Sequence, residues 1–177
     1  MSEQTHEIMM HAPGRQIFED FKTHASAVDR FTAEAMFAGS FEAWLHNCMA
    51  TAVYCRSAYL NLDGKPVPLV MFGVNHVQGE KWNPWIVTTG YADGSYKFAK
   101  SLLAFMDDYM NVMCDIVTLK HWTKHRGGVL IAPVLETYVH ADNRGTLGLC
   151  RRLGFTIDEP AAAGSEGHLF CRVWRML

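Results

Sequence analysis

The sequence predicts a single domain over residues 1–177, of the α/β (α+β) class, with a mixed, mostly antiparallel sheet flanked by helices. The first observation is size and composition, since 177 residues that are 49% hydrophobic and 19% charged can bury one sizeable core. The second is that helical spacing dominates the first third of the chain, whereas strand-like runs joined by turn residues follow it. The third is that helical segments separate the later strands, which indicates a mixed sheet.

Three helices are expected before the first strand. Apolar residues recur at helical spacing over 16–22, which predicts the first helix. Thr32 is expected to cap a helix over 33–37, and Ser40 to cap another over 41–49. A side-chain oxygen at such a position accepts a hydrogen bond from an unpaired N–H of the first helical turn.

Three strands are predicted next, over 51–60, 67–77 and 84–89. The first two are rich in Val, Tyr and other strand-forming residues. Asp63-Gly64 lies between them and favours a tight turn, because glycine tolerates a positive φ. The remaining elements are a long helix capped by Ser95, a second helix or its continuation over 114–125, a strand over 134–139, a short helix opened by Asp142 or Asn143, and closing strands over 155–157 and 168–174.

Charge and cysteine content narrow the possible partners. The net charge is −2, whereas a dedicated nucleic-acid site usually requires a basic excess, so no such site is expected. The five cysteines are odd in number and contain no CxxC pair, which favours reduced thiols in a cytosol. No apolar stretch approaches the ~20 residues that span a bilayer, so no membrane segment is expected.

The strongest motif lies in residues 139–155. Asn143, Thr146, Leu149 and then Leu153-Gly154-Phe155 follow the spacing of the late strand–helix unit of the GNAT acyltransferase superfamily, which this segment resembles. The resemblance implies a GNAT-like fold and, for an active member, acetyl-CoA as the acyl donor. A capped helix that ends at a glycine also occurs in many other folds, so this alternative reading of the segment stays open.

The same resemblance singles out two candidate catalytic residues. Cys150 takes the position of the family's usual general-acid tyrosine. A thiol can donate a proton if it is partly exposed and has a suitable pKa, but a free cysteine is more commonly a small buried apolar residue. Glu136, in the middle of a predicted strand, is either a general base or a carboxylate that faces solvent.

The loop that would bind the acyl-CoA diphosphate departs from the family pattern. In the best alignment Gly94, Lys97 and Ala99 take the loop positions, and Asn143 is a further candidate contact to the cofactor. Asp93 would repel a diphosphate, and Lys97 is bulky where the family has a glycine. The expectation is therefore that no cofactor binds, with acetyl-CoA as the cofactor if the protein is an enzyme.

A second resemblance, to a narrower family, accounts for these departures from the GNAT pattern. Asn83-Pro84-Trp85, the long helix without a phosphate loop, Asp142-Asn143, the acidic-Pro-Gly loop over 158–164 and the aromatic closing strand resemble the GNAT-like small internal virion (core) protein of short-tailed phages. That family implies an internal virion or morphogenesis protein without acetyltransferase activity, linked to virion assembly and DNA ejection. Its implied partners are other virion or scaffold proteins, and its implied location is the host cytoplasm during assembly or the virion interior.

The alternative function is an active acyl-CoA-dependent N-acyltransferase that acts on a small amine or a host protein. It predicts a V-shaped cleft between the strands over 84–89 and 134–139. The cleft would have to be open, and filling by Tyr96, Phe98 or Trp85 would count against this function.

Two further groups of residues have competing interpretations. His121 and His125 lie four apart on a predicted helix, and with His140 they could hold a metal, but no established ligand spacing supports this and no metal site is expected. Trp82 and Trp85 could form an exposed patch for another virion protein, or could pack in the core.

Overall fold

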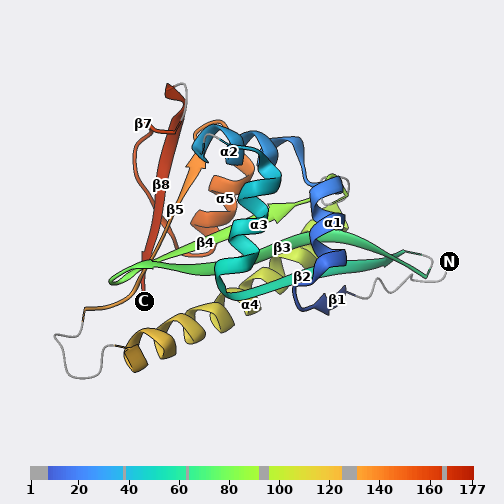
Figure 1. The fold of residues 1–177 in the computed structure, drawn as a ribbon, viewed down its shortest axis with the longest axis horizontal. Coiled ribbons are helices and arrows are strands. Elements are labelled where there is room, and N and C mark those ends of the chain that lie inside the picture. The colour runs from blue at the N-terminus through green and yellow to red at the C-terminus, as the bar shows by residue number, and fades with distance from the viewer. Residues whose placement is uncertain (1–7, 38, 63, 92–95, 125–130, 165–166) are drawn as a thin grey trace.

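A computed structural model describes residues 8–37, 39–62, 64–91, 96–124, 131–164 and 167–177 (Figure 1). Its helices are α1 (Arg15–His24), α2 (Ala27–Phe37), α3 (Phe41–Thr51), α4 (Tyr96–Lys124) and α5 (Arg144–Arg152). Its strands are β1 (Ile8–His11), β2 (Ala52–Leu62), β3 (Lys65–Gln78), β4 (Lys81–Thr88), β5 (Val134–His140), β6 (Thr156–Ile157), β7 (Ala161–Ala162) and β8 (Leu169–Met176).

The strands form one mixed, mostly antiparallel sheet, which confirms the predicted fold class. The order along the sheet is β1-β2-β3-β4-β5-β8-β6, and β7 pairs with β8. The pairing of β4 with β5 is parallel, whereas the other pairings are antiparallel. Figure 1 shows β5 and β8 rising away from the direction of β2, β3 and β4. The sheet therefore opens at the β4–β5 junction.

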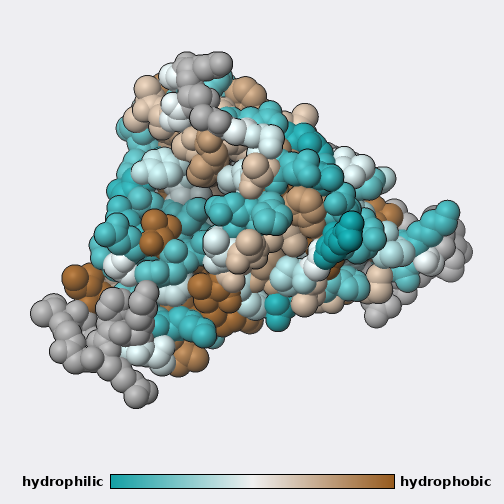
Figure 2. Space-filling model, in the orientation of Figure 1, coloured by the Kyte–Doolittle hydropathy of each residue, from teal (hydrophilic) through white to brown (hydrophobic). Residues whose placement is uncertain are grey.

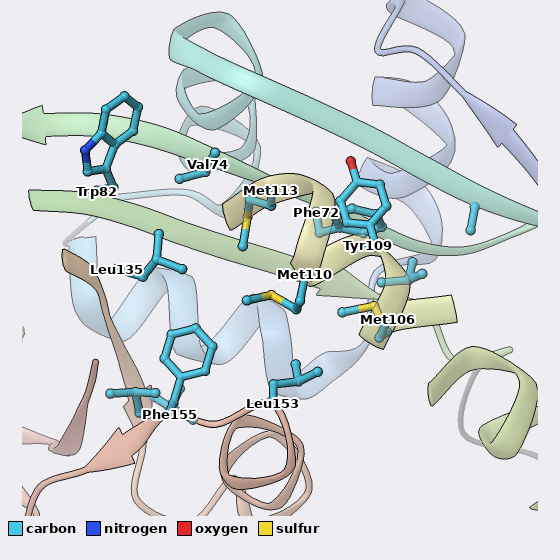
Figure 3. Packing of buried hydrophobic residues seen from close by; sticks show 14 of the residues in the cluster. Phe72, Val74, Trp82, Met106, Tyr109, Met110, Met113, Leu135, Leu153 and Phe155 are labelled. Atoms are coloured by element: carbon cyan, nitrogen blue, oxygen red, sulfur yellow. The ribbon is translucent and has the colours of Figure 1, made fainter. Parts of the chain in front are cut away.

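Helices cover both faces of the sheet. Helices α1, α2 and α3 pack on one face around Phe21, Phe41 and Leu45, together with Trp85 and Val87 of β4. Helix α4 packs on the other face through its apolar stripe, which includes Met106, Tyr109, Met110, Met113 and Val117. Figure 3 shows Leu153 and Phe155 reaching the same cluster from the end of α5.

Local capping signals predicted several helix ends correctly. The Ser40 hydroxyl accepts from the Ala43 N–H at the start of α3, as expected. The predicted cap at Thr32 is wrong, because α2 already begins at Ala27. Ser26 takes that place and accepts from the Asp29 N–H, while Thr32 lies within the helix and donates to the Val28 carbonyl.

Residues 114–124 continue α4 and do not form a second helix, and both Ser95 and His125 lie outside the described residues. Strands β1 and β7 were not predicted, and both are short. Gly64 has φ 79° in the predicted turn, and Gly154 has φ 79° after α5, so both glycines hold a conformation that other residues rarely adopt.

Among the described helices, none is long and apolar enough to cross a membrane. On the face shown in Figure 2 the most hydrophobic residues occur in small, separate patches within a largely polar surface. Some aromatic residues build the interior, such as the buried Trp82, Trp85 and Phe170, whereas others, such as Phe37 and Tyr138, are exposed.

Gly73 of β3 lies under the indole of Trp85. A Cβ atom at this position would lie 2.5 Å from Trp85 Cζ2 and 2.7 Å from the Tyr54 carbonyl oxygen. We expect Gly73→Ala to lower the free energy of unfolding by about 1–3 kcal/mol through overpacking, measured by urea unfolding.

The matched control is the same substitution at Gly148, in the exposed part of α5, where no atom lies within 4 Å of the added Cβ. Gly148→Ala should raise the free energy of unfolding by about 0.5–1 kcal/mol, because it restricts the unfolded chain. Equal effects of the two substitutions would contradict the close approach of Trp85 to β3.

Candidate functional site

The candidate site is the gap between β4 and β5. The two strands pair only at Lys81 with Val134 and at Trp82 with Leu135. Beyond these pairs they diverge, which produces the V-shaped opening that the acyltransferase hypothesis predicted. A gap inside a sheet leaves backbone groups that need other partners.

Asn83 occupies the apex of the V. With its nitrogen turned toward the surrounding acceptors, the Asn83 amide donates to Thr137 Oγ1 at 3.1 Å. The same nitrogen lies 3.2 Å from the Pro84 carbonyl oxygen and 3.3 Å from the Glu136 carbonyl oxygen. The Asn83 side chain thus takes the place of the next backbone hydrogen bond between the strands and connects β4 to β5 where they diverge.

The far end of β4 is held by the start of α2. The Thr88 N–H and hydroxyl both donate to Asp29 Oδ2, at 2.7 and 2.6 Å. The Thr88 carbonyl accepts from the Ser26 N–H at 2.8 Å. The backbone of Thr88 therefore points away from β3 and toward the opened side of β4.

Strand alternation then places the backbone of Ile86. The register of β4 against β3 is regular from Trp82 to Thr88, so every second residue directs its N–H and C=O to the same side. The backbone N–H and C=O groups of Trp82 and of Thr88 point away from β3. Ile86 lies an even number of residues from both, so its N–H and C=O also point away from β3. Its backbone N–H and C=O point into the gap, where β5 is no longer within pairing distance.

A cavity of about 400 Å³ occupies this gap. Its lining includes residues of both core clusters, for example Trp85 on the α2–α3 side and Phe72 on the α4 side, so the cavity connects the two faces of the sheet. The wall is mostly apolar. Its described lining comes from α2 and α3 (Asp29, Thr32, Ala33, Met36, Phe37, Trp44), from the strands (Phe72, Gly73, Val77, Lys81, Asn83, Pro84, Trp85, Ile86, Glu136, Thr137, Tyr138, Val139) and from α4, α5 and the residues that flank α5 (Met106, Tyr109, Met110, Met113, Asn143, Thr146, Leu149, Cys150, Leu153, Phe155).

Glu136 lines the cavity but is held in an ion-pair network. Its Oε2 accepts from Arg172 Nη2 at 2.6 Å and Nε at 3.0 Å, and its Oε1 lies 3.4 Å from Lys81 Nζ. The side chain is only 12% exposed, which disfavours the interpretation of Glu136 as a carboxylate that faces solvent. Burial acts to raise the pKa of Glu136, but the hydrogen bonds and charges of Arg172 and Lys81 outweigh it and lower the pKa. The carboxylate is therefore a weak base.

Cys150 and Asn143 also line the cavity. Burial raises the pKa of the Cys150 thiol to about 11, so the thiol stays protonated near neutral pH. Asn143 caps α5, because its Oδ1 accepts from the Thr146 N–H at 3.1 Å. The structure thus brings three predicted site residues, Glu136, Asn143 and Cys150, to one cavity.

The structure describes the residues predicted to bind the diphosphate only in part. Gly94 lies outside the described residues, and Lys97 and Ala99 belong to the first turns of α4, where only the backbone is described. The helix nevertheless begins close to the end of β4 along the chain, where a GNAT-like fold would bind a diphosphate.

His121 and His140, two of the three histidines considered as metal ligands, each contact a backbone group. His121 is buried, and its Nε2 lies 2.8 Å from the Ile131 carbonyl oxygen. His140 accepts at Nδ1 from the Asp142 N–H at 3.3 Å, and His125 lies outside the described residues. Within the described part of the chain, no three potential ligands among His, Cys, Asp and Glu are grouped to hold a metal ion.

Both tryptophans of β4 are core residues. Trp82 is 3% exposed and Trp85 is 6% exposed, which confirms the packing interpretation over the exposed patch. The Trp85 indole donates from Nε1 to Asn75 Oδ1 and packs over Gly73. Trp85 therefore forms a fixed wall of the cavity, and the space beside it remains open.

Sequence reasoning missed the role of Ile86 and the bridging role of Asn83. A backbone N–H carries no sequence signature, so Ile86 could not be found from residue type. A signal for the apex did exist in Asn83-Pro84-Trp85, because Pro84 cannot donate to a neighbouring strand.

Comparison with known proteins identifies the fold of the chain. No protein-family profile and no curated protein matches the sequence. A chain provisionally assigned as a phosphinothricin N-acetyltransferase matches with a TM-score of 0.64 and 11% identity, over 97% of this chain and 99% of that chain. An N-acetyltransferase from Staphylococcus aureus Mu50 matches with a TM-score of 0.57 and 12% identity, over 96% and 97% of the two chains. Spermidine N-acetyltransferase from Vibrio cholerae, solved with CoA and spermine, matches with a TM-score of 0.58 and 9% identity, over 96% and 95%.

The chain therefore has the fold of the GNAT N-acetyltransferases, a name carried by a further match from Bacillus anthracis with a TM-score of 0.54. Sequence identities near 10% establish the architecture alone. The resemblance to a phage virion protein remains a prediction from the sequence.

The Glu136 network yields a pH-dependent prediction. Glu136→Gln should lower the free energy of unfolding at pH 7 by about 1–2 kcal/mol, because the ionic hydrogen bonds from Arg172 are lost. The folded-state pKa of Glu136 is lowered, so this stabilisation is fully present above the ordinary carboxyl pKa of about 4.3 and is lost as the pH falls through the folded value. Urea unfolding between pH 7 and pH 3 should show the two proteins converging.

Glu42→Gln is the matched control, since Glu42 is an exposed carboxylate paired with Lys22 on another part of the surface. Its effect at pH 7 should stay within about 0.5 kcal/mol. A difference between Glu136→Gln and the unchanged protein that is constant over the whole pH range would rule out a lowered pKa.

Proposed function

We propose that the protein is an acyl-CoA-dependent N-acyltransferase, with the cavity between β4 and β5 as its active site. The observation that supports this most directly is the backbone of Ile86, which faces an apolar cavity of about 400 Å³ at the point where the strands part. An N–H in such a place is suited to a ligand carbonyl. The likeness to solved N-acetyltransferases supports the same function at the level of the fold.

An acyl-CoA would supply a thioester, whose carbonyl carbon is activated toward an amine. In the proposed site the Ile86 N–H binds the thioester carbonyl oxygen and stabilises negative charge that develops there. The apolar walls contributed by Met106, Met110 and Leu149 exclude water and thereby strengthen that hydrogen bond. The residues present thus fit the thioester group.

Neither of the two residues predicted to transfer a proton is well suited to that role. Glu136 is paired with Arg172 and Lys81 and has a lowered pKa. Cys150 stays protonated, and a thiol with a pKa of about 11 is a poor acid at neutral pH. We therefore assign both residues to the wall of the cavity and attribute catalysis mainly to orientation of the two reactants and to the Ile86 N–H.

Ile86→Pro tests the assignment directly. Proline removes the N–H that faces the cavity, and the ladder to β3 should survive because the Ile86 N–H does not take part in it. We expect the variant to remain folded by circular dichroism and to lose about 10²–10³ in kcat for acetyl transfer from acetyl-CoA. Isothermal titration with acetyl-CoA should also show weaker binding.

Ile86→Val is the control, since it keeps the N–H and trims one methylene group. It should bind acetyl-CoA and turn over within about threefold of the unchanged protein. The proposed function fails if the unchanged protein shows neither acetyl-CoA binding nor amine acetylation, or if Ile86→Pro is as active as Ile86→Val.

A second candidate function is the phage virion or morphogenesis role, with other virion or scaffold proteins as partners. The observation that favours it is that neither predicted proton-transfer residue, Glu136 or Cys150, is suited to acid–base chemistry. Mass spectrometry of purified particles from a phage that encodes the chain tests this role. Finding the chain inside particles, together with no acetyl-CoA binding in titration, would favour the virion role over the enzyme.

A further inference from the structure

The α2–α3 side of the cavity has an aromatic wall. The rings of Phe37 and Trp44 stack with centroids 6.1 Å apart and an interplanar angle of 29°. Trp44 meets Trp85 edge to face at 6.4 Å. Met36 completes this wall, and Phe37 is 55% exposed at the cavity surface. The wall fits a flat or apolar body of a few heavy atoms.

The carboxylates in the lining already accept strong hydrogen bonds. Asp29 Oδ2 accepts from Ser26 Oγ at 2.9 Å, in addition to the two bonds from Thr88. Glu136 is paired with Arg172 and Lys81. A cationic amine that bound one of these carboxylates would share it with the donors already in place, in a largely apolar space that solvates an ammonium group poorly.

The described lining also offers few groups that could take a proton from an ammonium group. The described lining residues include no histidine. The Cys150 thiol remains protonated, and burial raises the pKa of the Tyr109 hydroxyl. An alkyl amine with a lysine-like pKa of about 10.4 is uncharged in only about one molecule in 2,500 at pH 7. Such an amine would bind almost entirely through its rare neutral form.

From these three features we infer that the acyl acceptor is an uncharged primary amine on an aromatic body, of the weakly basic arylamine class, and not a polyamine. This inference rests on the proposed function and specifies its second substrate. In the transfer, the amine nitrogen forms a bond to the thioester carbonyl carbon while the carbon–sulfur bond breaks. The sulfur leaves with the bonding electron pair, and the proton released from nitrogen passes to that thiolate, giving an amide and a free thiol.

Two isomeric amines distinguish the effect of the ligand's charge on binding from the effect of its shape. 4-Methylaniline is uncharged at pH 7, whereas benzylamine, with the same atoms, is a cation. Binding to the protein, measured by tryptophan fluorescence, should be independent of pH between 7 and 9 for 4-methylaniline. For benzylamine the affinity should rise about tenfold per pH unit over most of that range, as its neutral fraction rises. Spermidine at pH 7 should bind at least about tenfold more weakly than 4-methylaniline.

Variants of the wall locate the binding site. Phe37→Ala should weaken 4-methylaniline binding about three- to tenfold. Leu119→Ala, which removes a 65% exposed side chain of α4 outside the cavity lining, should leave it unchanged. Met36→Glu adds an unpaired carboxylate of similar length, and should strengthen spermidine binding at pH 7 by about tenfold relative to the neutral control Met36→Gln.

The outcomes distinguish the acceptor class from the proposed function. Acetylation of spermidine but not of 4-methylaniline, or benzylamine binding that does not depend on pH, would overturn the arylamine assignment and leave the acyltransferase function intact. Binding of 4-methylaniline in the predicted pattern, without any acetyl transfer, would support the ligand class and count against the acyltransferase function. Acetylation of 4-methylaniline with a kcat/KM that is flat from pH 7 to pH 9 supports both.

Discussion

The early end of the pairing between β4 and β5 is the constraint on which the rest of the site depends. Two parallel strands that begin side by side would normally continue to pair, because each unpaired backbone group costs free energy in a dry interior. Here pairing ends after Trp82 and Leu135, and Asn83 provides the last bridge. At the other end of β4, Asp29 and Ser26 bind the backbone of Thr88. Between these two anchors the Ile86 backbone is held open toward the cavity, where a ligand can pair with it.

The same geometry explains why the cavity is apolar although charged residues surround it. Glu136, Asp158, Arg172 and Lys81 form a continuous network across β4, β5, β8 and the segment after β6, in which two negative charges face two positive charges. Trp174 adds a hydrogen bond from its indole N–H to Asp158. The network stabilises the splayed half of the sheet and, for the same reason, removes Glu136 from proton-transfer chemistry. Stability and low basicity are two results of one set of hydrogen bonds.

The likeness to solved N-acetyltransferases and the absence of a strong acid or base in the described lining are compatible. Acyl transfer from a thioester to a neutral amine needs orientation, exclusion of water and stabilisation of charge on the carbonyl oxygen. In the proposed function, the shape of the cavity between β4 and β5 and the Ile86 N–H supply these. The decisive property is whether the Ile86 N–H binds a thioester carbonyl, because one fold can host many functions.

Local sequence determined much of the secondary structure and part of the site. The caps at Ser40 and Asn143 and the turn at Gly64 were predictable, because each involves atoms within a few residues of one another. The start of α2 was misplaced, because the Ser26 cap is completed by Asp29 and by Thr88, which lies 59 residues beyond Asp29. Glu136 was recognised as a candidate, but its pairing with Arg172, 36 residues away, decides what it can do. Only the tertiary structure could show the cavity, since the parting of two strands and the neutralisation of a carboxylate depend on contacts between segments far apart in the chain.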